Sequence, residues 1–204
     1  MSTAEATLPV VLGPELNGTL MTPEEFDAVE DADENYVYEL IHGVLIVSPP
    51  PLEGERGPND YLGYLLHRYR EDDPRGTSLD ETLPEHLIRT PNSRRRADRA
   101  IWAGLGRPPD TRREIPSITV EFVSEGKRNR QRDYVEKKEE YEAAGIVAYW
   151  LIDRFRRIMT VCRGGKPVII VKETESYSSP LLPGFVLPLA RLLEIAHRLE
   201  GAAQ

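Results

Sequence analysis

Two apolar runs rich in β-branched residues, separated by one helix-like run, constrain the fold of this chain more than any other feature. Residues 115–124 (IPSITVEFVS) and 146–152 (IVAYWLI) have the composition of buried strands. Between them, residues 132–144 have the pattern of a helix, and Gly145 follows as a favoured C-terminal cap. A strand, a helix and a second strand in this order are typical of a βαβ-like unit and predict an α/β fold.

The first third of the chain predicts a short helix and a β-hairpin. Thr22-Pro23-Glu24-Glu25 combines an N-cap, a proline at the first helical position and an acid three residues after the cap, so a helix is expected up to about residue 30. Residues 36–41 and 44–47 are β-rich, and His42-Gly43 between them is a two-residue turn with glycine second.

The other elements predict a mixed sheet that helices flank. Apolar residues recur at helical spacing over residues 57–71 and again over 187–199, which indicates an amphipathic helix and a closing C-terminal helix. Further strands are expected at residues 86–90, 97–103, 158–161 and 166–171. The predicted fold is therefore α/β, a central mixed β-sheet flanked by helices.

Length and composition describe one ordinary domain. A chain of 204 residues fits a single core, so we expect a loose N-terminal arm at residues 1–20 and one domain over residues 21–200. No apolar run reaches the roughly 20 residues that span a bilayer, and the N-terminus lacks the basic region of a secretory signal. The single Cys162 excludes an internal disulfide and a Cys-rich zinc site. We therefore expect a cytoplasmic protein with no membrane partner.

Charge is distributed unevenly along the chain. The net charge is −8, but residues 89–138 contain fourteen Lys or Arg against seven acids, a local charge of +7, which leaves −15 for the rest. This asymmetry fits a solvated basic face balanced by an acidic one, and it fits a nucleic-acid-binding region equally well. The candidate nucleic-acid contacts are Arg94, Arg95, Arg96, Lys127, Arg128 and Arg130.

Two acids and one lysine in this region have the residue types of a hydrolytic metal site. Asp98 and Glu121 lie in strand-like runs, and Lys137 lies in the helix-like run that follows. Carboxylates are ligands that Mg²⁺ and Mn²⁺ prefer, and such an ion activates water for phosphodiester hydrolysis. A nearby lysine can orient the water or stabilise the transition state. Lys137 also precedes Tyr141 by four residues, so the two share a helix face.

Each of these residues also has a purely structural interpretation. Glu39, inside the apolar hairpin strand, could pair with an arginine across the sheet, and Asp98 could pair with the arginines around it. Lys137 could be solvated. Glu121 is the hardest to explain in this way, because an ionisable group in the most apolar strand must shift its pKa or meet a cation.

Other catalytic motifs are missing from the sequence. It contains no GxSxG elbow, P-loop, GxGxxG or HExxH pattern, and its four histidines lack metal-ligand spacing. His42, close to Glu39, is the only histidine near a candidate site, and it is explained as a turn residue.

Several motifs in a fixed order make a more specific case. They are MTPEEF at 21–26, YELIHG at 38–43, VSPPP at 47–51, AD at 97–98, VEFVS at 120–124, RDYVEK at 132–137, Tyr141, AG at 144–145, YWLID at 149–153 and SPLLPG at 179–184. Over about residues 21–195 the chain resembles the Uma-two family of endonucleases. The resemblance implies a restriction-endonuclease-like fold of the PD-(D/E)xK type.

The resemblance also implies a set of site residues. The family's hairpin glutamate falls on Glu39, its first strand acid on Asp98, its second strand acid on Glu121 and its displaced helical lysine on Lys137. Val123 occupies the position at which an ExK motif has its lysine, so a lysine from the helix must provide the positive charge at the site. The chain departs from the family pattern at Ala97, at His42 and at Pro58-Asn59-Asp60, where a proline, an aspartate and a histidine are frequent.

We therefore expect an endonuclease that cleaves nucleic acid, most simply DNA. Glu39, Asp98 and Glu121 are expected to hold Mg²⁺ or Mn²⁺, and Lys137 to orient the attacking water. The alternative is a non-catalytic nucleic-acid-binding or assembly module that keeps the fold and forms a homodimer through a sheet edge or the terminal helix.

Overall fold

The computed structural model describes residues 11–124, 126 and 131–202, and the chain divides into two compact units. The first unit extends to Pro50 and includes Ile88–Arg96; the second contains the remaining residues. Residues 1–10 of the predicted arm, and the predicted contacts Lys127, Arg128 and Arg130, lie outside the described residues. The expectation of one domain over residues 21–200 stays a prediction.

The first unit contains the predicted helix and hairpin. Its elements are β1 (Val11–Leu12), η1 (Pro14–Leu16), α1 (Pro23–Asp27), β2 (Asp31–Ala32), β3 (Val37–Ile41) and β4 (Val44–Ser48). The Thr22 hydroxyl accepts from the Glu25 N–H at 3.1 Å, and the Thr22 N–H donates to the Glu25 carboxylate at 2.7 Å. This reciprocal capping box confirms the predicted start of the helix, which ends at Asp27, three residues earlier than expected.

The hairpin has the predicted register. Strands β3 and β4 pair antiparallel, with Ile41 opposite Val44, so that two residues form the turn. His42 and Gly43 have φ of 49° and 79°, both in the left-handed region that a tight hairpin turn requires. His42 is therefore a turn residue, as the sequence indicated.

An ion pair fixes α1 to the start of β6 (Arg94–Ala103). The Arg94 guanidinium donates to both carboxylate oxygens of Asp27, at distances from 2.6 to 3.0 Å, and to the carbonyls of Thr90 and Ser93. These hydrogen bonds from Arg94 lower the pKa of Asp27, against the opposing effect of burial.

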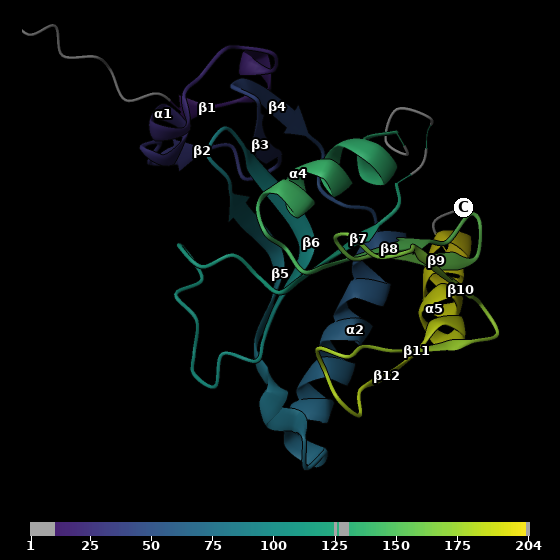
Figure 1. The fold of residues 1–204 in the computed structure, drawn as a ribbon. Coiled ribbons are helices and arrows are strands. Elements are labelled where there is room, and N and C mark those ends of the chain that lie inside the picture. Colours follow the sequence, from purple (N-terminus) through teal and green to yellow (C-terminus); the bar gives the residue numbers. More distant parts are fainter. Residues whose placement is uncertain (1–10, 125, 127–130, 203–204) are drawn as a thin grey trace, which may run out of the picture. The chain divides into compact units, whose positions relative to one another are not determined.

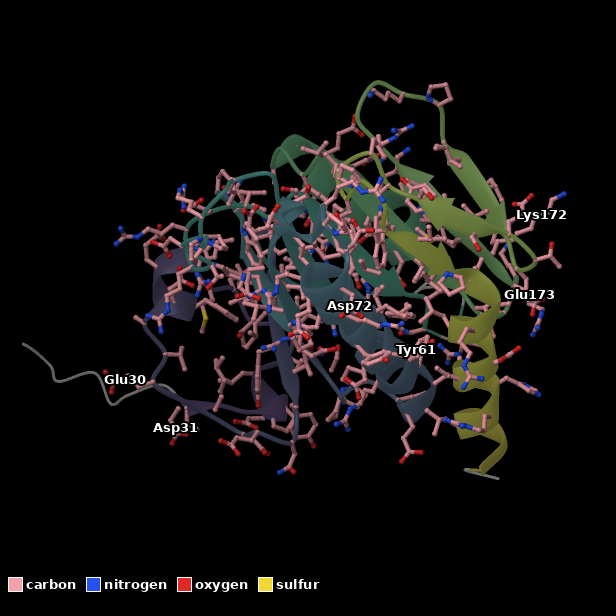
Figure 2. The ribbon with its side chains drawn as sticks, turned by 90° about the horizontal axis from the view of Figure 1, so that it is seen from below. Glu30, Asp31, Tyr61, Asp72, Lys172 and Glu173 are labelled. Atoms are coloured by element: carbon pink, nitrogen blue, oxygen red, sulfur yellow. The ribbon has the colours of Figure 1, made fainter. Side chains whose placement is uncertain are left out.

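The lowered pKa gives a pH-dependent prediction. An acid whose pKa falls on folding stabilises the folded state above its unfolded pKa of about 3.9, and this stabilisation is lost as the pH falls through the folded pKa. We expect Asp27→Asn to lower the melting temperature at pH 7 and to lose this effect as the solution is acidified. Asp31→Asn, at an exposed residue labelled in Figure 2, is the matched control. Thermal unfolding measures both, and a deficit for Asp27→Asn that is independent of pH would contradict the assignment.

The second unit contains a mixed sheet with the strand order β10-β9-β8-β7-β6. Its further elements are β5 (Leu79–Arg89), which pairs with β6, β7 (Ile118–Phe122), β8 (Ala148–Asp153), β9 (Ile158–Cys162) and β10 (Ile169–Lys172). Strands β7 and β8 are parallel, while β6 with β7, β8 with β9, and β9 with β10 are antiparallel. Between β7 and β8 the chain forms η3 (Arg132–Glu136), a π-helical turn, and α4 (Lys137–Ala143), which confirms the βαβ unit.

Two helices of the second unit pack side by side, α2 (Glu53–Asp72) and α5 (Leu189–Ala202), as Figure 1 shows in blue and yellow. Short elements η2 (Gly76–Ser78), β11 (Ser176–Ser178) and β12 (Val186–Pro188) complete the unit. Apolar residues of these helices and of one sheet face form the core, among them Leu62, Leu66, Trp150, Leu189 and Leu192. At its rim, the Arg191 guanidinium lies 5.9 Å from the ring centre of Tyr61, which Figure 2 labels on α2.

Three elements begin earlier than their sequence patterns indicated, and one of them is β6, which starts at Arg94 instead of Ala97. Helix α2 starts at Glu53, four residues before the predicted start, because the Glu55 carboxylate accepts from the Leu52 N–H at 3.1 Å and Pro58 is tolerated inside the helix. Strand β5 starts at Leu79 instead of His86. Its first half contains Pro84, and Glu85 has a φ of 48°, which is a local irregularity that hides the strand from an alternation pattern.

Within the described ranges, the chain forms no helix of the length and apolarity needed to cross a bilayer. The expected cytoplasmic setting and the homodimer stay predictions.

Candidate active site

Glu121 lies in the middle of β7 and is only 3% exposed. Side chains alternate between the two faces of a strand, so Glu121 points away from its neighbours Val120 and Phe122. These neighbours belong to the hydrophobic core that α2 and α5 share. Glu121 therefore lies on the sheet face opposite this core, the face that meets α4.

Lys137 and Tyr141 of α4 both contact this carboxylate. The Lys137 ammonium donates to one oxygen of Glu121 at 2.7 Å, and the Tyr141 hydroxyl donates to the other at 2.8 Å. Lys137 is 3% exposed and Tyr141 is fully buried. The prediction that Lys137 and Tyr141 share one helix face is confirmed. Lys137 provides the positive charge that a lysine at position 123, two residues after Glu121, would provide in an ExK motif.

Burial determines the protonation of Glu121. It raises the pKa of Glu121 to about 7, the Lys137 ammonium opposes the rise, and the nearby Asp133 carboxylate adds to it. The residue is thus a carboxyl group that titrates near neutral pH, with one cation holding its charged form. Such a perturbed pKa with a specific charge partner is characteristic of functional sites.

Asp98 lies on β6, the neighbour of β7. Strands β6 and β7 are antiparallel, and the register pairs Arg99 with Val120. Asp98 and Glu121 each follow one position further along this pair of strands, so they are neighbours across the two strands. The Asp98 carboxylate accepts from the Phe122 N–H at 2.6 Å. Burial and the charge of Glu121 raise the pKa of Asp98 well above its ordinary value, while Lys137 lowers it. Two acidic groups thus repel one another beside one lysine.

Helix α2 holds the segment of β6 that contains Asp98. The Asn59 amide donates to the Asp98 carbonyl at 2.7 Å, and its oxygen accepts from Arg99 Nε at 2.8 Å. Arg99 also donates to the Asn59 carbonyl and to the Thr82 hydroxyl. Gly63 leaves room for this guanidinium, because a Cβ there would lie 2.6 Å from Arg99 Nη2. Asn59 stands in the Pro58-Asn59-Asp60 segment, one of the departures from the family pattern, and spacing alone gave no sign of its contacts.

Two more residues near Glu121 escaped the sequence analysis. Asp133, 2% exposed, lies four residues before Lys137 on the same helical run, and its carbonyl accepts from the Tyr149 hydroxyl at 2.9 Å. The rings of Tyr141 and Tyr149 meet edge to face with centroids 5.4 Å apart. The four-residue spacing of Asp133, Lys137 and Tyr141 is the signal that could have identified Asp133.

The structure places Glu39 and the arginine cluster in the first unit. The Glu39 carboxylate, 5% exposed, accepts from the Arg96 N–H at 2.9 Å. Arg94 binds Asp27, as described above, and Arg95 is fully buried. The assignments of Glu39 to the metal and of these arginines to nucleic acid stay predictions.

The carboxylates of the second unit suit a divalent cation. Their oxygens are hard ligands of the kind that Mg²⁺ and Mn²⁺ prefer, and the repulsion that raises the pKa of Asp98 is one that a bound cation would relieve. In the part of the chain that the structure describes, no three His, Cys, Asp or Glu side chains gather as a metal-ligand cluster.

A crystal structure has the same fold as this chain. It is that of a "putative nuclease belonging to DUF820" from Anabaena variabilis ATCC 29413, with a TM-score of 0.68 and 14% sequence identity over 86% of this chain and 99% of the other. A search of curated proteins finds no match. The model of the Uma2 family, described as "Putative restriction endonuclease", matches residues 23–190. Because this match covers more than half of the sequence, the chain belongs to the Uma2 family.

Proposed function

We propose that this protein is a metal-dependent endonuclease that hydrolyses phosphodiester bonds in DNA. The observation that carries the proposal is the 2.7 Å contact of Lys137 with Glu121 on the strand next to Asp98. It combines one buried acid, Glu121, and one half-buried acid, Asp98, with one lysine on the sheet face that α4 meets. Membership of a family described as restriction endonucleases supports the same chemistry.

Asp98 and Glu121 are the groups that would hold the cation. A divalent cation at such a site lowers the pKa of a bound water and neutralises charge on the phosphate oxygens. The Phe122 N–H fixes one oxygen of Asp98, and Asn59 fixes its main chain, so the carboxylate is oriented before any ligand arrives. Glu39 is a further proposed ligand, on the resemblance alone.

Lys137 has two roles in this proposal. Its ammonium favours the charged form of Glu121 that a ligand needs, because it opposes the effect of burial on the pKa. It is also the fixed positive charge that orients the attacking water and stabilises the developing phosphorane charge. The Tyr141 hydroxyl holds the second oxygen of Glu121 and so limits the rotation of the carboxylate.

The basic region is the proposed substrate-binding element. Residues 89–138 carry a local charge of +7, which suits a polyanion, and binding through it would weaken as salt is added. We propose DNA as the substrate and Mg²⁺ as the ion in the cell, with Mn²⁺ as a substitute of similar ligand preference.

Glu121→Gln tests the proposal directly. Glutamine keeps the shape and the hydrogen-bond acceptor but lacks the charge, so we expect magnesium-dependent nicking of supercoiled plasmid to disappear in the variant while the circular dichroism spectrum is unchanged. Calorimetric titration with Mn²⁺ should show uptake by the wild type and a loss in the variant. Equal nicking by both proteins would refute the site. Neither nicking nor metal uptake by the wild type would favour the non-catalytic binding module. Parallel assays with single-stranded RNA identify the nucleic acid.

A further inference from the structure

A hollow of about 180 Å³ lies beside the Tyr141–Tyr149 pair. Residues of α4, the start of β8, the end of β9 and the turn after β9 line it: Lys138, Tyr141, Glu142, Ile146, Tyr149, Cys162, Arg163, Gly164, Gly165, Lys166 and Val168. Tyr141 and Tyr149 therefore border both the hollow and the Glu121 site. We call this feature the Arg163 hollow.

The lining of the Arg163 hollow is positively charged. Lys138, Arg163 and Lys166 contribute three cations, and Glu142 contributes one acid. Lys138 and Arg163 are half-buried, whereas Lys166 is exposed. Among the residues that the structure describes, none of these three cations has an ion-pair partner within 4.0 Å. A hollow whose lining has a net positive charge attracts an anion.

Arg163 gives an independent observation. Its Nε is buried and has no hydrogen-bond partner among the described residues. A buried donor without a partner costs free energy, and buried donors in folded proteins are nearly always satisfied. The Nε has no exposed surface, so an oxyanion in the hollow would accept from the other donors of the guanidinium. Arginine binds phosphate and carboxylate oxygens through its fork of donors.

The size and charge of the hollow limit the ligand. Pockets for drug-sized molecules have roughly 300–1,000 Å³, so 180 Å³ suits a smaller group. Three cations against one acid leave a charge of +2, which balances a dianion. We propose that the Arg163 hollow binds a phosphate group, either as inorganic phosphate or as the terminal phosphate monoester of a nucleotide or of a DNA end. This site does not depend on the nuclease proposal.

The chain provides its own reporter at this site. Cys162 is the only cysteine of the sequence, is half-buried and lines the hollow. A phosphate bound beside it should shield the thiol from a neutral alkylating reagent. The rate of Cys162 modification by iodoacetamide, followed by mass spectrometry, therefore measures occupancy of the hollow itself.

The experiment titrates the full-length protein with inorganic phosphate in EDTA, and then with a deoxynucleoside 5′-monophosphate and a 5′-phosphorylated oligonucleotide. We expect saturable protection of Cys162, and an affinity at least about tenfold weaker in the Arg163→Gln/Lys166→Gln variant, since charge-assisted hydrogen bonds are lost. Lys172→Gln removes the same type of charge from an exposed residue, which Figure 2 labels near the end of β10, and should bind as the wild type does.

Two further proteins separate this site from the Glu121 site. Lys137→Gln and Glu121→Gln should retain phosphate protection, even if neither variant nor the wild type cleaves DNA. A loss of phosphate affinity in Lys137→Gln, with wild-type affinity in Arg163→Gln/Lys166→Gln, would place phosphate at the Glu121 site and overturn the proposal. Absence of protection in the wild type up to high millimolar phosphate would also overturn it. The ligand with the lowest dissociation constant identifies the source of the phosphate.

Discussion

Asp98→Asn is expected to stabilise the metal-free protein while it removes activity. Asparagine can still accept from the Phe122 N–H, but it removes an acid whose pKa is raised by burial and by the charge of Glu121. We expect the free energy of unfolding in EDTA to rise by about 0.5–2 kcal/mol at pH 7. The same change removes a proposed ligand, so magnesium-dependent nicking should fall by about 10²- to 10³-fold.

Thermal unfolding and plasmid nicking measure the two effects in one preparation. For a chain of this length, each kcal/mol corresponds to a melting-temperature shift of about 2–4 °C. Glu71→Gln, at an exposed position of α2, removes the same charge far from any described acid pair and should change neither quantity. Saturating Mg²⁺ should stabilise the wild type and leave Asp98→Asn unaffected. A variant that melts lower than the wild type in EDTA would show that Asp98 is a structural acid.

Lys137→Met is expected to damage both stability and activity. The variant leaves Glu121, 3% exposed, without the cation 2.7 Å from its carboxylate. Breaking a buried ion pair by removing one partner costs about 3–5 kcal/mol while the other stays charged. Nicking should fall by about 10²- to 10³-fold, because the positive charge proposed to orient the attacking water is lost.

The stability loss of Lys137→Met should depend on pH in a definite direction. Lys137 lowers the pKa of Glu121, so its removal moves that pKa further above the value of about 7. An acid whose folded pKa exceeds its unfolded pKa destabilises the folded state increasingly as the pH rises between the two values. The difference between variant and wild type in urea unfolding should therefore be smaller at pH 5 than at pH 8. Lys172→Met is the control, and a difference that shrinks as the pH rises would contradict the ion pair.

The sequence predicted the elements around Glu121 well, because their signals are local. The apolar run at residues 115–124 contained β7, and the helix pattern closed by Gly145 contained α4. Lys137 and Tyr141 share a face because four residues make about one helical turn, so their joint contact with Glu121 could be anticipated. The Thr22 capping box was predictable for the same reason.

Contacts between distant segments could not be predicted. Nothing in the spacing of Asn59 and Asp98, 39 residues apart, indicates that an α2 amide holds a β6 carbonyl. The ion pair of Arg94 with Asp27, 67 residues away, also had no signal in the sequence, because the two residues meet only in the folded chain. Strand β5 was half hidden, since Pro84 and the positive φ of Glu85 break the alternation that reveals a strand.

The helical origin of Lys137 has a kinetic consequence. A lysine two residues after Glu121 would share its strand and would be present whenever β7 is formed. Lys137 instead reaches Glu121 only while α4 is docked, so the site is complete only after the βαβ crossover has closed. Transient undocking of η3 and α4 would disconnect the lysine without unfolding the sheet. Hydrogen exchange in this segment would then report the fraction of molecules in which the proposed site is complete at any moment.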